Sequence, residues 1–341
     1  MHDARLVPPS FDAGKRLIRY HAMRWLTMPG MTSVGVGRCE VDRTPTDEIG
    51  VQFTVRRKLS SRELKAAGAL PVPKAFRLDD GRMLRTDVAE RAYRRTHFDP
   101  LTPAAAPASP PDPRRARLDP VRPGGSIGHF ASEAGTIAAV VWDAGGVPHL
   151  LSNWHVLAGP GISPGQDICQ PGVLDSADEH GNRVGSLVRR HLSLAGDGAI
   201  CSIEGRTFDD RILELDVVPR RLHVPEIGDP VVKCGRTTGV TRALVSRVNV
   251  VAVVSYPQGD RNISGFEVVS NPAHPPGVQG IAEGGDSGSM WMIDAIAPDD
   301  DIAVGLQVCG RDGPLESGDS AIACYLGPLL DRLGVTLRPG P

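Results

Sequence analysis

The sequence predicts a mainly β protein that begins with a small α+β unit. Glycine and proline account for 39 and 30 of the 341 residues, a content that favours many short strands and turns over long helices. From residue 125 onward, short apolar runs alternate with turn residues, as in a sandwich or barrel. Residues 125–341 are numerous enough for two small barrels side by side.

The amino-terminal residues predict the α+β unit. Residues 11–27 combine apolar and basic side chains at helical spacing, which indicates one short amphipathic helix. Two strand-like runs, 33–41 and 49–56, lie on either side of a turn and predict a hairpin. A second short helix is expected after Ser60, which has the chemistry of an N-cap. We therefore predict an amino-terminal domain over residues 1–96, without recognisable chemistry of its own.

Residues 97–124 change in composition and predict a linker rich in Pro, Ala and Arg. The run 103–111 contains only proline, alanine and one serine, so it is expected to be extended and unable to pack. The basic cluster Arg114–Arg117 is interpreted as solvated linker. The alternative is a processing site that separates the first domain from the rest.

Charge and cysteine content exclude several classes of function. The formal net charge of −2 gives no bulk attraction to nucleic acid or membrane, and no run approaches the roughly 20 apolar residues of a membrane span. No signal peptide is recognisable, so we expect a cytoplasmic protein. None of the six cysteines forms a CxxC pair, and their thiols are expected to be reduced. No phosphate-binding loop or metal cluster stands out, so neither a cofactor nor a metal is expected.

One stretch carries the chemistry that a nucleophile requires. Glu283–Ser289 places glycines on both sides of Ser287, and an apolar strand-like run follows. A tight turn there exposes the hydroxyl, and the backbone N–H groups of Gly285 and Ser287 can converge on a developing oxyanion. The alternative is an ordinary Gly/Ser turn between two strands, which is very common.

Two further residues, together with Ser287, could form a catalytic triad. His155 directly follows an apolar strand-like run, and Asp197 lies just ahead of another. Each has an ordinary explanation by itself, as an exposed histidine and a turn aspartate. Their order with Ser287, at separations of 42 and 90 residues, favours a His-Asp-Ser triad instead.

These segments resemble motifs of one family. The run Ser152–Ala158 resembles the histidine motif of trypsin-like (chymotrypsin-fold) serine peptidases, and Gly285–Ser289 resembles their nucleophile motif. The segment at Asp197 resembles their acid motif, with Gly198 as a departure.

Two more segments narrow the resemblance to bacterial members. Cys234–Gly239 resembles a segment of the streptogrisin and α-lytic type, and Val304–Gly310 resembles the strand that lines the primary specificity pocket. The resemblance covers about residues 125–335.

The resemblance implies two six-stranded antiparallel β-barrels, at about 125–225 and 226–335, with the triad in the cleft between them. It implies a serine endopeptidase acting on peptides or proteins, with Ser287 as nucleophile, His155 as base and Asp197 orienting the histidine. The N–H groups of Gly285 and Ser287 would form the oxyanion hole.

The resemblance also implies an ion pair. In the bacterial type an arginine holds the acid beside the nucleophile, so we predict an Asp286–Arg236 ion pair that supports the oxyanion loop. Cleavage in the linker would then not be needed to form the oxyanion hole.

Substrate preference follows from the residues expected around the pocket. These are Ile281 and Ala282 before the glycines, and Gln307, Val308 and Cys309 on the wall. No aspartate is placed to bind a basic side chain, so we expect a small or apolar residue before the cut. The wall strand also lacks the serine that many members place near the triad acid, which predicts that Asp197 loses a polar neighbour.

Two other interpretations remain open. The chain is alternatively a catalytically weak module of this fold that binds protein partners. The amino-terminal domain is alternatively a pro-region or inhibitor that covers the cleft.

Overall fold

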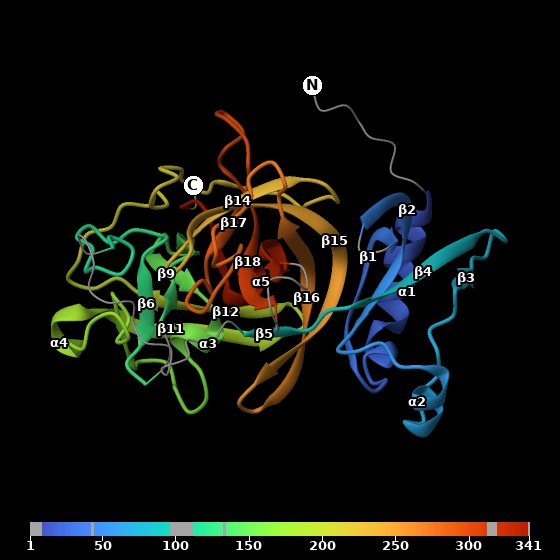
Figure 1. The fold of residues 1–341 in the computed structure, drawn as a ribbon. Coiled ribbons are helices and arrows are strands. Elements are labelled where there is room, and N and C mark those ends of the chain that lie inside the picture. Colours follow the sequence, from blue (N-terminus) through green and yellow to red (C-terminus); the bar gives the residue numbers. More distant parts are fainter. Residues whose placement is uncertain (1–8, 42–43, 96–111, 132–133, 312–318, 340–341) are drawn as a thin grey trace.

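The computed structural model describes residues 9–41, 44–95, 112–131, 134–311 and 319–339. It is mainly β, with two large sheets preceded by a helix-plus-strand region (Figure 1). The predicted fold class is therefore confirmed. In the part of the chain that is described, no helix has both the length and the apolar character needed to cross a membrane.

The amino-terminal region consists of a helix packed on a hairpin, with further short elements beside it. Its elements are α1 (Pro9–Trp25), β1 (Met31–Val41), β2 (Thr44–Val55), α2 (Ser61–Ala66), β3 (Ala75–Arg77) and β4 (Met83–Glu90). The strands β1 and β2 pair antiparallel, as the alternating sequence predicts. Ser60 caps α2 in a full capping box with Glu63. Side chains from α1, β1, β2 and β4, including Phe11, Ile18, Val36, Phe53 and Leu84, belong to a buried apolar cluster that also contains residues of the carboxyl-terminal half, such as Val248 and Val251.

The carboxyl-terminal sheet contains a closed ring of six strands. They follow one another in the order β14, β17, β18, β19, β16 and β15, and β15 pairs back with β14. Their bounds are β14 (Pro230–Gly235), β15 (Gly239–Tyr256), β16 (Gly259–Ser270), β17 (Met290–Ile293), β18 (Ile302–Arg311) and β19 (Ser320–Tyr325). This ring carries the segment around Ser287 on the connection from β16 to β17.

The second sheet has eight strands in the order β20, β8, β9, β12, β11, β10, β6 and β7. Their bounds are β6 (Ser126–His129), β7 (Gly135–Thr136), β8 (Ala139–Asp143), β9 (Pro148–Ser152), β10 (Asp167–Cys169), β11 (Arg183–Ser193), β12 (Gly196–Ser202) and β20 (Val335–Thr336). The remaining helices are α3 (Trp154–Leu157), α4 (Glu179–Asn182) and α5 (Leu326–Leu333), and β13 (Arg221–Leu222) pairs with β18. This sheet carries the histidine and aspartate segments.

The amino-terminal strands join the six-stranded ring. Strand β1 pairs antiparallel with β15, with Val34 opposite Val251, so the ring, the amino-terminal strands and β13 form one twelve-stranded sheet. A further short strand, β5 (Tyr93–Arg95), pairs with β18 of the ring. Figure 1 shows the chain leaving β4 and crossing to the large body, where β5 lies.

The predicted linker is ordered over its second half. Residues 97–111, with the Pro/Ala run, lie outside the described residues. Arg114 pairs with Asp112 at 2.8 Å and with Glu214 at 3.4 Å, and its carbonyl accepts the Ser126 N–H at 2.7 Å. The interpretation of this arginine as solvated linker is therefore wrong, because its side chain is mostly buried against the second half of the chain.

Candidate active site

Asp197 and His155 are brought together by the pairing of β9 with β12. The two strands pair with Ala199 opposite Ser152, so the start of β12 lies beside the turn that begins α3. The Asn153 side chain donates to the Asp197 carbonyl at 2.7 Å and fixes that turn. His155 follows two residues later, in the first turn of the helix.

The Asp197 carboxylate orients the imidazole of His155. One carboxylate oxygen accepts the backbone N–H groups of Trp154 at 2.6 Å and His155 at 3.3 Å. The other lies 2.5 Å from Nδ1 of His155. This contact assigns the proton to Nδ1 and leaves Nε2 as the acceptor. Among the described residues, the buried Nε2 has no hydrogen-bond partner.

A tyrosine that the sequence did not reveal completes the surroundings of Asp197. The Tyr256 hydroxyl donates to the same carboxylate oxygen as His155, at 2.6 Å. Burial acts to raise the pKa of Asp197, but His155 and the Tyr256 hydroxyl outweigh it, so the pKa lies below its ordinary value. The expectation that Asp197 lacks a further polar neighbour is therefore wrong. The donor comes from the end of β15 instead of the wall strand.

Ser287 lies in a turn that glycines make possible. Gly285 and Gly288 have φ angles of 99° and 90°, values that L side chains rarely adopt. The Ser287 hydroxyl donates to the Val308 carbonyl of β18 at 3.5 Å. The turn therefore places this side chain beside the wall strand.

Thr136 of β7 connects the serine turn to the histidine segment. Its N–H donates to the Ser287 carbonyl at 2.8 Å, and its own carbonyl accepts the Ser152 hydroxyl at 2.7 Å. Its hydroxyl donates to the Gly285 carbonyl at 2.8 Å. The preceding Gly135 has no room for a side chain, because a Cβ there would meet Val156 and would lie 2.8 Å from the Ser287 carbonyl oxygen. The two segments therefore meet at this short strand, and a Cβ on Gly288 would lie 2.3 Å from the Ser152 hydroxyl.

Lys233, and not Arg236, is the cation that pairs with Asp286. Lys233 is fully buried in β14, and its Nζ lies 3.3 Å from the Asp286 carboxylate and 2.9 Å from the Thr238 hydroxyl. The backbone N–H groups of Thr237 and Thr238 also donate to this carboxylate, at 2.9 and 3.1 Å. Burial acts to raise the pKa of Asp286, but Lys233 and hydrogen bonds from the Glu283 N–H and from Thr238 keep it below its ordinary value. The predicted Asp286–Arg236 ion pair is wrong.

Arg236 turns to the other side of the loop. Its guanidinium binds both carboxylate oxygens of Asp175, with Nε 2.6 Å from one of them. It also donates to the Thr237 hydroxyl at 3.1 Å. Arg236 therefore reaches the loop before Ser287 through Thr237 instead of through Asp286.

The peptide between Gly284 and Gly285 has a fixed orientation. The Thr237 hydroxyl donates to the Gly284 carbonyl at 2.5 Å. Because C=O and N–H point to opposite sides of a trans peptide, the Gly285 N–H points away from Thr237. No acceptor among the described residues binds that N–H.

The residues expected around the pocket are buried or partly buried. Ile281, Val308 and Cys309 are almost fully covered, and Ala282 is partly covered. The Gln307 amide accepts from the Trp291 indole at 2.8 Å and donates to the Cys309 carbonyl at 3.0 Å. Gln307 is thus bound inside the ring, and the pocket assignment of all five residues stays a prediction.

A lone lysine within the apolar strand β14 is a sequence signal for a buried partner, because lysine is almost never fully buried without one. Tyr256 and Thr136 had no such signal.

Over the described ranges, no group of three or more His, Cys, Asp or Glu side chains is arranged to hold a metal ion.

Comparison with known proteins gives matches only among solved structures. No family model and no curated protein matches the chain. A Nocardiopsis protease is 19% identical over 64% of this chain and 100% of its own, with a TM-score of 0.47. A glutamic-acid-specific serine protease is 21% identical over the same shares, with a TM-score of 0.48. Thermobifida fusca protease A is 20% identical over the same shares, with a TM-score of 0.46. At these identities the likeness concerns the fold alone. The evidence for the chemistry of the site comes from the residues of this chain.

Proposed function

We propose that this chain is a serine endopeptidase of the chymotrypsin fold, with Ser287, His155 and Asp197 as its triad. The observation that carries the proposal is the buried His155–Asp197 contact at 2.5 Å, which leaves Nε2 of the imidazole as a proton acceptor. The contacts of Thr136 with both the Ser287 turn and the histidine segment also support it.

The proposed reaction has two halves. The Ser287 Oγ attacks the carbonyl carbon of a peptide bond while Nε2 of His155 takes its proton. The C–N bond then breaks, and the leaving amine receives that proton, which leaves an acyl ester on Ser287. Water attacks the ester with the same histidine as base, and the acid product leaves. Asp197 keeps the tautomer and stabilises the imidazolium that forms in each half.

The proposed oxyanion hole uses the N–H groups of Gly285 and Ser287. The hydrogen bond from Thr237 to the Gly284 carbonyl supports this, since it directs the Gly285 N–H away from the loop interior. Each such donor contributes on the order of 10²- to 10³-fold in kcat. Asp286 with Lys233, and Arg236 acting through Thr237, are proposed to hold this loop.

The proposal assigns residues 125–341 to the peptidase, 1–96 to a regulatory domain and 97–124 to the connection between them. All the proposed catalytic residues lie within the first of these ranges. The substrates are peptides or proteins. The six buried cysteines are free, which supports a reducing compartment such as the cytoplasm.

Labelling by a small fluorophosphonate probe, with mass spectrometry of the adduct, tests the proposal. We expect one adduct on Ser287 that Ser287→Ala and His155→Ala both abolish. Ser255→Ala, which removes an exposed hydroxyl of β15, serves as the matched control and keeps the adduct. An adduct on another residue, or undiminished labelling of His155→Ala, would contradict the proposal.

A further inference from the structure

Strand β18 presents one edge to β19 and the other to the serine turn. Along this second edge β17 pairs with residues up to Leu306, and the Gln307 backbone then bonds to Gly288 and Ser289. The next carbonyl, of Val308, accepts the Ser287 hydroxyl. Beyond Val308, the same edge of β18 continues past the proposed nucleophile.

Strand β5 occupies this continuation. Arg95 lies opposite Cys309, Arg94 opposite Gly310 and Tyr93 opposite Arg311, in antiparallel pairing. Because β19 already pairs with Cys309 and Gly310 from the other side, β5 lies on the edge that holds Ser287. From Tyr93 to Arg95 the chain runs toward Val308.

We propose that β5 occupies the edge on which a peptide substrate pairs, so that the chain blocks its own site until β5 is displaced. This inference rests on the proposed function. An extended peptide that adds to a sheet edge uses the main-chain N–H and C=O groups of that edge. The groups of Cys309–Arg311 serve β5, and they cannot serve a substrate at the same time.

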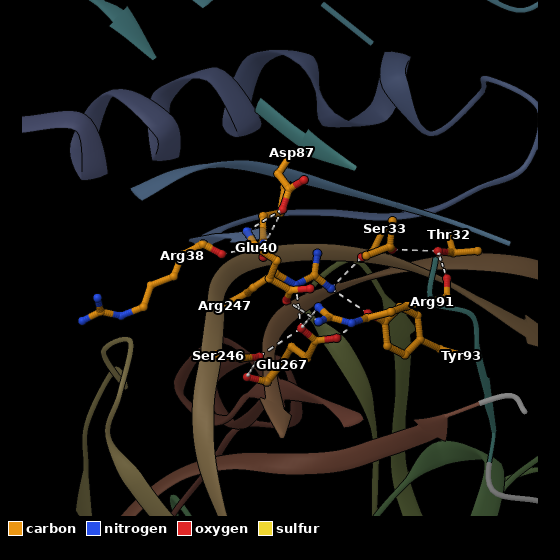
Figure 2. A network of polar contacts seen from close by, with 12 residues as sticks. Thr32, Ser33, Arg38, Glu40, Asp87, Arg91, Tyr93, Ser246, Arg247 and Glu267 are labelled. Atoms are coloured by element: carbon orange, nitrogen blue, oxygen red, sulfur yellow. Dashed lines mark hydrogen bonds and ion pairs between the residues drawn. The ribbon is translucent and has the colours of Figure 1, made fainter. Parts of the chain in front are cut away.

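A buried charge network anchors the start of β5 (Figure 2). The Tyr93 hydroxyl donates to the Glu267 carboxylate at 2.5 Å and accepts from the Arg247 guanidinium at 2.6 Å. Arg247 also binds Glu267 at 2.6 Å, and both of these side chains are fully buried. Breaking such a network in a dry interior is costly, because it leaves charges without partners.

The same network reaches the amino-terminal sheet. Arg91, two residues before Tyr93, binds Glu267 at 3.2 Å and also pairs with Glu40 of β1. Arg247 of β15 donates to the Ser33 hydroxyl of β1 at 2.9 Å. The position of β5 is therefore coupled to the seam between β1 and β15, and a partner that opens this seam releases β5.

The test compares two substrates of the full chain. A single acylated alanine p-nitrophenyl ester does not need the edge, whereas a tetrapeptide ester that ends in the same alanine pairs with it. We expect wild type to hydrolyse both with similar kcat/KM. Tyr93→Phe removes the hydroxyl from the network and raises the ratio of tetrapeptide to single-residue kcat/KM roughly tenfold. Tyr325→Phe is the matched control, since it removes another partly buried tyrosine hydroxyl, which accepts the Asn249 N–H at 2.8 Å, and its ratio stays at the wild-type value.

A second measurement uses only wild type. We expect the backbone amides of Tyr93–Arg95 to lose protection from hydrogen exchange when a tetrapeptide boronate binds, but not when a single-residue boronate binds. A wild-type ratio as high as that of Tyr93→Phe, or protection that survives the tetrapeptide boronate, would overturn the inference. Failure of every variant to hydrolyse the single-residue ester would instead overturn the proposed function.

Discussion

Asp197 and Asp286 are both completely buried, and they differ in what neutralises them. Asp286 is bound by the lysine Lys233 and by backbone N–H groups. In the described part of the chain, Asp197 has no lysine or arginine partner, and its contacts are His155, Tyr256 and backbone N–H groups. One carboxylate therefore has a permanent counter-charge, and the other, among the described residues, has no lysine or arginine bound to it.

This difference distinguishes a carboxylate with a structural role from one with a proposed catalytic role. Because Lys233 neutralises Asp286, this carboxylate contributes little electrostatic stabilisation to a charge that forms elsewhere during the reaction. Its contacts hold the loop instead. A carboxylate without a fixed counter-charge favours positive charge on its neighbour, which supports the proposal that Asp197 stabilises the imidazolium of His155. Four of the five predictions below change one side of this comparison, and the other concerns the buried network at Glu267.

The largest effect is expected for Asp197→Asn. An amide in this place holds the wrong tautomer of His155, and kcat falls roughly 10⁴-fold. The thermal midpoint should change little, because the amide can still accept the Trp154 N–H. Steady-state ester hydrolysis and calorimetry measure the two quantities. A loss below tenfold would remove Asp197 from the triad.

Lys233→Met is expected to act on stability. It leaves Asp286 as an unpaired buried charge, which costs about 3–5 kcal/mol in the free energy of unfolding. The double variant Lys233→Met with Asp286→Asn should recover most of this loss. Urea unfolding of the single and double variants is the measurement, and equal stability of the two would contradict the ion pair.

The network at Glu267 predicts a pH dependence of stability. Burial acts to raise the pKa of Glu267, but Arg247 and Arg91 outweigh it and hold the pKa at about 2 against 4.5 in the unfolded chain. A lowered pKa stabilises the folded state above the unfolded value, and this contribution is lost as the pH falls through the folded value. Stability should therefore fall by on the order of 3 kcal/mol between pH 4.5 and about 2. Unfolding followed over this range should show a shallower fall in Glu267→Gln, and an equally steep fall would contradict the assignment.

Thr237→Val tests the orientation of the oxyanion peptide. Without the hydroxyl the Gly284 carbonyl is free to rotate, and kcat should fall by roughly 10- to 100-fold with little change in KM. Thr237→Ser keeps the donor and should retain most of the activity. A loss in Thr237→Ser as large as that in Thr237→Val would show that the methyl group, and not the hydrogen bond, is what matters.

Tyr256→Phe should have the smallest effect. It removes one hydrogen bond to the Asp197 carboxylate, so we expect roughly a 3- to 10-fold fall in kcat/KM. Because the carboxylate then keeps more negative charge for the imidazolium, the acid limb of the pH profile should move to higher pH. An unchanged profile together with lowered stability would make Tyr256 purely structural.

The sequence predicted the parts of the site that lie in local motifs. The segments around His155 and Ser287 depend on a strand followed by a turn, which a short run of residues can reveal. Tyr256 lies 59 residues from Asp197 in the chain and belongs to no motif, so only the folded ring brings them together.

Two failures of the sequence analysis also have physical reasons: it chose Arg236 instead of Lys233 as the partner of Asp286, and it did not predict β5. Lys233 and Arg236 are three residues apart, and β14 is buried on both faces, so alternation along the strand does not show which side chain turns toward Asp286. Strand β5 has only three residues, two of them arginines, and its pairing partner lies more than 200 residues later. The mainly β class needed no such long-range information, because glycine, proline and the short apolar runs encode it locally.

The most direct test of the proposed triad is to trap its acyl intermediate. The protein is mixed with p-nitrophenyl acetate, quenched in acid, and analysed by intact mass and peptide mapping. The proposed mechanism predicts one acetyl group on Ser287 in wild type, and a strongly reduced amount in Asp197→Asn. Absence of the adduct from wild type, or its presence at another residue, would contradict it.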